Sequence, residues 1–254
     1  MISYLLNKFK RKPQDNVFRV PAGWQVYAVG DIHGRADLLK KLHSLILEKS
    51  KAAPKKKKLV VYLGDYLDRG AHVRETIDEL LSDPLPGFRY KHLMGNHEQF
   101  LLKFLDDPSI IRIWKDLGGD ATLMSYGVDV SGTAFFDGQD EEIRRQLLNS
   151  MPRGHIEFIK NLEPFFRFGD YLFIHAGIRP GKALEDQKPE DIHWIRDDFL
   201  SSKQDHGVRI IHGHTITERV EEFPNRIGID TGAFFTGVLS CAVLEDDQAS
   251  IIHT

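Results

Sequence analysis

Short apolar runs, rich in β-branched and aromatic residues, recur along the chain, and most are followed by a turn that contains glycine. Runs of this kind with turn residues at their ends predict buried β-strands. We expect strands at Trp24–Val29, Leu59–Leu63, Arg89–Met94, Tyr171–Ile174, Val208–Ile211, Arg226–Ile229 and Val238–Leu244.

Helical patterns lie between the early strands. Apolar residues that share one helical face predict a helix after the first strand: Leu38, Leu39, Leu42, Leu45 and Ile46. Two further helices are expected at Val73–Leu81, which ends before Asp83-Pro84, and at His97–Leu105, which ends before Pro108. Alternation of strands with helices is typical of an α/β fold.

The length and composition favour one domain. With 254 residues, 41% of them hydrophobic, the chain is long enough to bury a sizeable core. We expect that domain to cover residues 23–254, after an N-terminal extension of residues 1–22 that Pro21 and Gly23 close. Residues 106–162 have a mostly helical pattern without a ligand-type motif, which predicts a helical flank or cap on the same domain.

Charge and cysteine content narrow the partners and the compartment. A net charge of −3 gives no overall attraction to nucleic acid or to an anionic membrane, and the basic run 55–58 is expected to be a solvated turn. The single cysteine, Cys241, excludes an intramolecular disulfide and fits a reducing compartment. No apolar run approaches the roughly 18 residues of a membrane span. We therefore expect a cytoplasmic protein with neither a nucleic-acid partner nor stable membrane association.

Five glycine-containing motifs carry the chemistry: GDIHG at 30–34, GDYLDRG at 64–70, GNHE at 95–98, IHAG at 174–177 and HGHT at 212–215. Each is weak alone, but their order along one chain is specific. Together they supply six candidate metal ligands, Asp31, His33, Asp65, Asn96, His175 and His214. Oxygen and nitrogen donors without a thiolate suit two divalent ions such as Mn²⁺, Fe²⁺ or Zn²⁺.

The expected division of ligands places Asp65 between two metals, because a carboxylate can bridge them with its two oxygens. Asp31 and His33 are alternate residues of an extended segment and so share a face, which suits one metal. The second metal would take Asn96, His175 and His214. Two metals about 3.5–4 Å apart lower the pKa of a bridging water, and the resulting hydroxide attacks phosphorus directly. Such chemistry needs no protein nucleophile, and Cys241, in an apolar run, is expected in the core.

His97, directly after a predicted ligand, is the candidate general acid for the leaving group. Asp68 is expected to accept a hydrogen bond from it and to stabilise the imidazolium form. Arg69 can donate two hydrogen bonds to phosphate oxygens. Arg196 and Arg179 are both candidates for a second phosphate-binding arginine, and Arg196 is preferred.

Four other residues near the motifs have less specific interpretations. His212 is expected either to support a ligand or phosphate, or to pack. Asp230 either orients a histidine or shapes the turn before Gly232. Glu98 is expected to brace the start of its helix, and Trp194 to pack beneath the loop of Arg196.

The five motifs resemble those of the PPP-type serine/threonine phosphoprotein phosphatases, in their compact bacterial form, of the calcineurin-like metallophosphoesterase superfamily. The resemblance covers about residues 30–215. It implies a β-sandwich flanked by helices, a four-layer αββα arrangement with a dinuclear centre, and action on phosphoserine and phosphothreonine. It implies Mn²⁺ or an Fe/Zn pair on the six ligands given above, with His97 and Asp68 as the acid pair and Arg69 on phosphate. Arg196 has no counterpart in a motif that aligns, so its role is inferred.

The predicted function is therefore metal-dependent hydrolysis of a phosphoprotein or phosphopeptide. The alternative is a related hydrolase of dinucleoside polyphosphates, the symmetrical bis-nucleosyl tetraphosphate type, which this chain resembles around GGDATLMSYG and HAGIRPG. Against it, those enzymes typically have Asn where this chain has Asp68 and Asp where it has Glu98. The acidic pI counts against a nuclease, and the complete ligand set counts against an inactive scaffold.

Overall fold

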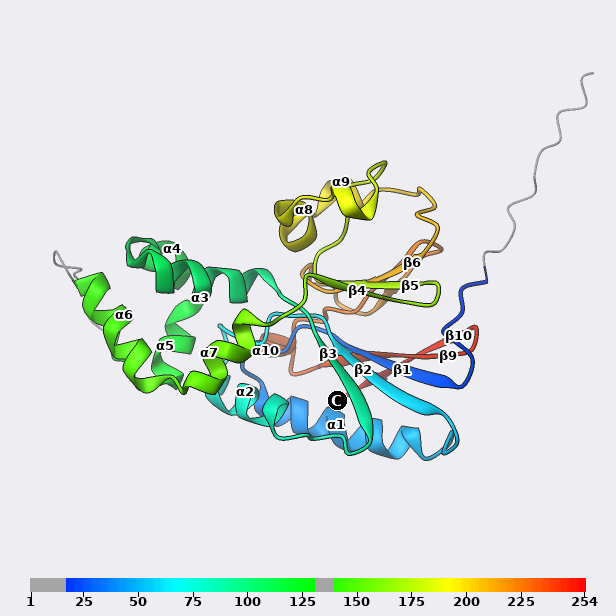
Figure 1. Cartoon of the computed structure of the whole chain (residues 1–254), viewed down its shortest axis with the longest axis horizontal. Helices are drawn as coiled ribbons and strands as arrows, with labels where there is room; N and C mark the ends of the chain where they lie inside the picture. Colours follow the sequence, from blue (N-terminus) through cyan, green and yellow to red (C-terminus); the bar gives the residue numbers. More distant parts are fainter. Residues whose placement is uncertain (1–16, 131–138) are drawn as a thin grey trace, which may run out of the picture.

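Two five-stranded sheets form the centre of the molecule. The structure is a computed structural model and describes residues 17–130 and 139–254. The sheets stack face to face, and helices cover both outer faces (Figure 1). This arrangement confirms the expected αββα sandwich. No helix in these two described ranges is long and apolar enough to cross a bilayer.

The first sheet has the strand order β10-β9-β1-β2-β3. Its strands are β10 (Gln248–His253), β9 (Ser240–Glu245), β1 (Trp24–Val29), β2 (Lys57–Tyr62) and β3 (Phe88–His92). β1, β2 and β3 are parallel, and β9 pairs antiparallel with β1. The central strands are buried on both faces, which explains why β1 and β2 read as continuous apolar runs.

The second sheet has the order β4-β5-β6-β8-β7. Its strands are β4 (Phe165–Phe168), β5 (Tyr171–Ile174), β6 (Arg209–His212), β8 (Arg226–Gly228) and β7 (Glu221–Glu222). β5, β6 and β8 run parallel. Val26 and Val61 of the first sheet belong to the same buried apolar cluster as Phe173 and Ile211 of the second, so the space between the sheets is core.

Two helices cover the outer face of the first sheet, α1 (Ala36–Ser50) and α2 (Val73–Leu81). Leu39 and Leu42 of α1 and Ile77 of α2 join Tyr27 and Val60 of the sheet in one buried cluster. Leu45 of α1 is 36% exposed, so it lies at the margin of the predicted apolar face.

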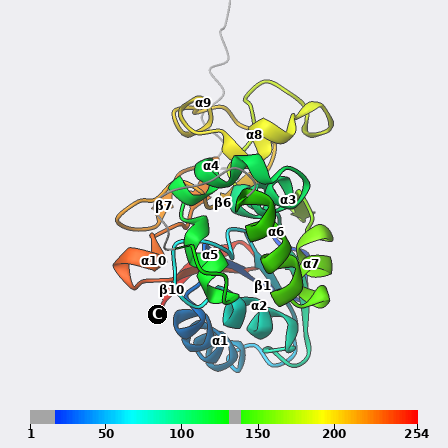
Figure 2. The same ribbon diagram turned by 90° about the vertical axis from the view of Figure 1, so that its left-hand side faces the viewer.

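A second group of helices lies at one end of the sandwich (Figures 1 and 2). It contains α3 (Asn96–Asp106), the 3₁₀ turn η1 (Pro108–Ile110), α4 (Ile111–Asp116), α5 (Gly119–Ser125), α6 (Gln139–Ser150) and α7 (Arg153–Lys160). Residues 106–162 are thus mainly helical where described; residues 131–138 lie outside the described residues. Trp114 and Leu147 belong to the core cluster of the first sheet, so this group shares that core.

Short elements cover the outer face of the second sheet: η2 (Leu184–Asp186), α8 (Pro189–Trp194) and α9 (Asp197–Leu200). Ile192 and Phe199 pack there with Leu172 and Ile210. The last helix, α10 (Ala233–Thr236), lies between β8 and β9 in the chain.

The sequence located most elements, and the differences are informative. β1, β5 and α2 have the expected bounds, whereas the other expected strands and helices are shifted by a few residues at one or both ends. β4, β7 and β10 were not expected; each is an edge strand of its sheet, with few fully buried side chains. Of the expected extension, residues 1–16 lie outside the described residues, while Val20 is buried and its N–H donates to Asp246 O.

Candidate active site

The site forms where loops from both sheets meet. Asp31 and His33 follow β1, Asp65 follows β2, and Asn96 opens the helix after β3. In the other sheet, the remaining predicted ligands, His175 and His214, follow β5 and β6. β1, β2 and β3 are parallel in the first sheet, and β5 and β6 are parallel in the second. Within each sheet the carboxyl ends of these strands therefore lie along one edge, which is where ligands bind in open α/β sheets.

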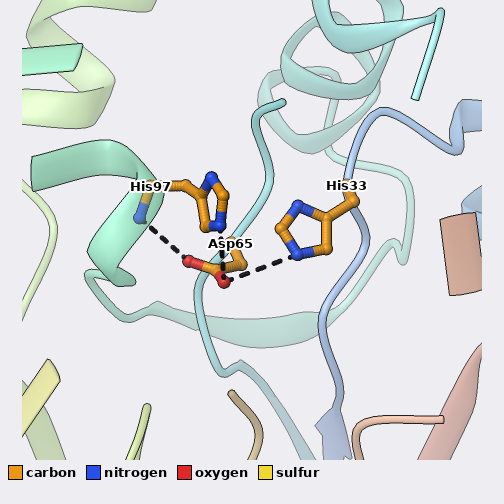
Figure 3. A group of neighbouring side chains, drawn as sticks. All are labelled: His33, Asp65 and His97. Carbon is orange, nitrogen blue, oxygen red and sulfur yellow. Dashed lines mark hydrogen bonds and ion pairs between the residues drawn. The ribbon is translucent and has the colours of Figure 1, made fainter. Parts of the chain in front are cut away.

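Asp65 lies at the centre of the site and belongs to two groups of potential ligands. One contains His33 and His97, the other His175 and His214, and within each group the ligand atoms lie within 4.8 Å of one another. Asp65 Oδ2 is 3.5 Å from His33 Nε2 and 3.8 Å from His97 Nε2. Dashed lines mark both contacts in Figure 3. Asp65 Oδ1 is 3.4 Å from His175 Nε2. The two carboxylate oxygens therefore face different groups, as a bridging ligand requires.

Asn96 and Asp31 complete the predicted set. Asn96 Oδ1 lies 2.8 Å from His175 Nε2 and 2.9 Å from His214 Nδ1. Asp31 Oδ2 accepts the backbone N–H of His214, and its Oδ1 is buried without a hydrogen-bond partner in the described structure. All six predicted ligands thus converge, although their binding of metal stays a prediction.

The hydrogen bonds of two histidines indicate that these residues fit a cation. His175 Nδ1 donates to Leu63 O, so its Nε2 carries a lone pair, and this lone pair faces oxygens of Asn96 and Asp65. His33 likewise donates from Nδ1 to Leu67 O. Burial lowers the pKa of both histidines well below the ordinary value, so both rings are neutral. Lone pairs that face one another repel unless a cation lies between them, and a carbonyl behind the ring is the usual support of a metal-binding histidine.

The buried carboxylates also favour a cation. Burial raises the pKa of Asp31 well above its ordinary value, and the neighbouring Asp230 and Asp65 raise it further. Burial likewise raises the pKa of Asp230 to about 6. Several acidic groups in a site without bulk water repel each other, and divalent ions would relieve that repulsion.

His97 and Asp68 form the expected pair. His97 Nδ1 lies 2.7 Å from Asp68 Oδ2, both side chains are buried, and His97 Nε2 has no hydrogen-bond partner in the described structure. Burial lowers the pKa of His97, but Asp65 and the hydrogen bond to Asp68 outweigh it, so the pKa is raised overall. The ring is therefore stabilised as an imidazolium whose Nε2–H is available as a proton donor.

Asp68 has further partners that the sequence did not reveal. Trp114 Nε1 of α4 donates to Asp68 Oδ2 at 3.0 Å, and the Thr122 hydroxyl of α5 donates to Oδ1. Asp68 N–H donates back to Thr122 Oγ1. The helical stretch without ligand-type motifs therefore helps to position Asp68 and, through it, His97. The only local sign was GGDATLMSYG, which contains Thr122.

The arginines differ in their availability. Arg69 Nη1 donates to His33 Nε2 at 3.1 Å, so its guanidinium reaches the centre. Arg196 is exposed and donates to Thr215 Oγ1, next to His214. Arg179 instead forms ion pairs with Asp191 and Asp198, both at 2.7 Å. These ion pairs hold Arg179 in place and favour Arg196 as the second phosphate-binding arginine.

Backbone geometry at the site is unusual. Residues other than glycine with left-handed φ angles include His33, Asp65, Asp68, Arg69 and His214. Such angles are uncommon for residues with a side chain and persist only where surrounding structure enforces them. Glu98 supplies part of that structure, because its carboxylate accepts backbone N–H groups of Asp65, Tyr66, Leu67 and Gly95. The expected brace thus also holds the loop after β2.

The remaining residues with open interpretations are placed by their contacts. Trp194 packs against Phe100 and the edge of His214, and its Nε1 donates to Gln99. Asp230 Oδ1 accepts Gly232 N–H, which fits the turn-shaping interpretation. The ring of His212 packs against Phe199 in an edge-to-face contact. Cys241 is fully buried in β9, as expected for a core residue.

This arrangement is that of a metallophosphoesterase, and sequence comparison agrees. The calcineurin-like phosphoesterase family matches residues 25–233, and the chain belongs to this family. Members of the family use divalent metal ions.

Curated relatives and solved structures are similar over most of the chain. Serine/threonine-protein phosphatase 2 of Salmonella typhimurium is 29% identical over 85% of this chain and 90% of its own length. Serine/threonine-protein phosphatase 1 of the same organism is 29% identical over 92% of this chain and 99% of its own. The crystal structure of a candidate diadenosine tetraphosphatase has a TM-score of 0.63 at 18% identity, covering 92% of this chain and 95% of the other. A cold-active protein tyrosine phosphatase has a TM-score of 0.55 at 20% identity, covering 90% and 78%. These two structures share the fold.

Proposed function

We propose that this metallophosphoesterase is a phosphomonoesterase that removes phosphate from phosphoserine and phosphothreonine in proteins. The observation that carries the proposal is the buried His97–Asp68 pair beside Asp65, with a nitrogen-to-oxygen distance of 2.7 Å. A monoester needs a proton donor for its leaving alkoxide, and His97 Nε2 is the candidate donor. The names of the curated relatives support this substrate class.

Two divalent ions are part of the proposal, with Mn²⁺ as the expected pair and Fe or Zn as alternatives. Asp31 and His33 would hold one ion, Asn96, His175 and His214 the other, and Asp65 both. When bound, such ions make water nucleophilic near neutral pH and offset the charge on phosphate.

The chain's own residues then orient the ester and move one proton. Arg69 and Arg196 are proposed to bind phosphate oxygens, because a guanidinium can donate two parallel hydrogen bonds to one phosphate group. Asp68 keeps the His97 ring oriented through Nδ1, so that Nε2–H can protonate the leaving oxygen. No protein nucleophile is required, and the protein we propose as substrate would supply the leaving hydroxyl of serine or threonine.

Comparing two substrates on one preparation tests the proposal. With Mn²⁺, a phosphoserine peptide should be hydrolysed with a higher kcat/KM than a dinucleoside tetraphosphate. The dinucleoside polyphosphate hydrolase is the alternative, and much faster cleavage of the nucleotide would establish it in place of the proposal.

A further inference from the structure

Three apolar side chains lie together beside the site and are here called the aromatic shelf: Ile216 and Phe235, which are exposed, and Phe234, which is partly buried. Phe235 is 65% exposed and Ile216 is 37% exposed. Phe234 and Phe235 have ring centroids 5.2 Å apart. A Cβ built on Gly232 would lie 2.4 Å from the Phe235 ring and 3.0 Å from Ile216 Cγ2, so these two side chains meet over one glycine.

The shelf adjoins the predicted phosphate position from two directions. The Phe234 ring lies 5.5 Å from the His33 ring, and the Arg69 guanidinium lies 4.9 Å from the Phe234 centroid. At the other end, Ile216 follows Thr215, whose hydroxyl accepts a hydrogen bond from Arg196. The shelf therefore extends between the two arginines that we propose for phosphate binding.

The backbone beneath the shelf is held firmly. Arg35 Nη1 donates to Ala233 O, and Thr236 Oγ1 donates to Thr231 O. Gly232 and Gly237, at the two ends of α10, both have left-handed φ angles. These contacts fix the backbone of α10 with the Phe235 ring in solvent, so the ring can be buried only by another molecule. Single exposed apolar residues are common, but a contiguous group at the rim of a catalytic site marks a binding surface.

We propose that the aromatic shelf selects substrates by binding an apolar side chain next to the phosphorylated residue of a peptide. This inference rests on the proposed protein phosphatase function. Phe234 is the ring beside the centre and Phe235 is the exposed one. Adjacent Cα atoms of a peptide are about 3.8 Å apart, so a neighbour of the phosphorylated residue can reach an exposed ring at the rim. The shelf then acts on binding selectivity, whereas the chemistry depends on the metal ligands and His97.

Two phosphoserine peptides that differ only in their flanking residues test the inference. One carries Leu on both sides of phosphoserine and the other carries Asn, which is similar in shape, uncharged and polar. The unmodified protein should prefer the Leu peptide by about tenfold in kcat/KM, at the lower end of what one apolar contact contributes to specificity. In Phe235→Ser this ratio should fall to about one to two, since the exposed ring makes the contact.

The matched control is Phe223→Ser. Phe223 is a partly exposed phenylalanine beside the edge strand β7, and its ring stacks on the Arg226 guanidinium. It should retain the tenfold ratio. Equal hydrolysis of the two peptides by the unmodified protein, or an unchanged ratio in Phe235→Ser, would refute the inference and leave the proposed function intact.

Two other outcomes would also overturn it. If Phe235→Ser selectively loses turnover of a phosphotyrosine peptide, the shelf binds the ring that bears the phosphate. If neither phosphoserine peptide is hydrolysed while a dinucleoside tetraphosphate is, the proposed function itself fails, and the inference fails with it.

Discussion

Asp68 and His97 are joined by a hydrogen bond of 2.7 Å, although 29 positions separate them in the chain. Asp68 lies in the loop after β2 and His97 in the first turn of α3, and α4 and α5 supply the other donors to Asp68. The helical group at the end of the sandwich therefore contributes directly to the orientation of the proposed acid.

Replacing His97 tests its role as a proton donor. His97→Asn should lower kcat for a phosphoserine peptide by about 10²–10⁴, the usual range for loss of a general acid. Metal content measured by atomic emission should not change, because six other side chains are the predicted ligands. Loss of metal in this variant would instead make His97 a ligand, consistent with its place in the group with His33 and Asp65.

Trp114 should influence activity through Asp68. Trp114→Phe removes the indole donor but keeps an aromatic ring beside Phe104, whose centroid is 4.9 Å away. We expect kcat to fall roughly three- to tenfold, the effect of losing about 1 kcal/mol of hydrogen bonding. Phe104→Leu is the control, because it perturbs the same core without removing a donor. If both variants lose stability and activity alike, the hydrogen bond has no specific role.

Arg196 and Arg179 should differ in effect. Arg196→Ala should raise KM for phosphate monoesters about tenfold or more, because it removes an exposed guanidinium that donates hydrogen bonds to phosphate. Arg179→Ala should instead lower the urea midpoint of unfolding, since it leaves the buried Asp191 carboxylate unpaired. The reverse pattern, in kinetics and urea titrations of both variants, would exchange the two assignments.

Metal removal should abolish activity reversibly. Mn²⁺ should support hydrolysis of a simple aryl phosphate, a chelator should stop it, and added Mn²⁺ should restore it. Binding should also stabilise the fold, by about 2.7 kcal/mol at a metal concentration of 100 times Kd. Asp31→Asn should reduce this stabilisation in calorimetry. Folded protein without turnover in any of several divalent ions would contradict the enzyme assignment.

His92 should make the fold sensitive to acid. Its ring lies between Tyr62 and Tyr90, and burial lowers its pKa to about 4. Between pH 6.5 and 4 the unfolded chain binds a proton that the folded protein does not, so this histidine lowers stability as pH falls. From pH 7 to pH 5 the loss is about 2 kcal/mol. Urea unfolding of His92→Phe should show a correspondingly smaller loss, and equal losses in both proteins would contradict the assignment.

The convergence of the predicted ligands could be expected from sequence because each lies in a short motif that follows a strand. Asp31 and His33 are two positions apart, and the loop after β2 contains both Asp65 and Asp68. Turn glycines mark these loops, and β1 and β2 are apolar enough to predict without tertiary information.

Contacts between distant segments could not be predicted in this way. Trp114 and Thr122 lie in helices without a motif, and only the fold brings them to Asp68. Likewise, the positions of Asp191 and Asp198 in sequence do not identify them as partners of Arg179, and these ion pairs only support the preference for Arg196 that the sequence suggested. β3 ends two residues before its expected end because Met94 N–H bonds to Glu163 O, outside the sheet.

The five left-handed residues of the site have a consequence for any effort to make this protein more heat-resistant. A side chain in that backbone region costs of order 1 kcal/mol or more, and glycine at Asp68 or His214 would relieve the cost. Such a replacement would also delete a functional group. Directed evolution that selects for heat resistance alone would therefore favour substitutions in the site and yield stable variants without activity. Activity must be screened in the same round.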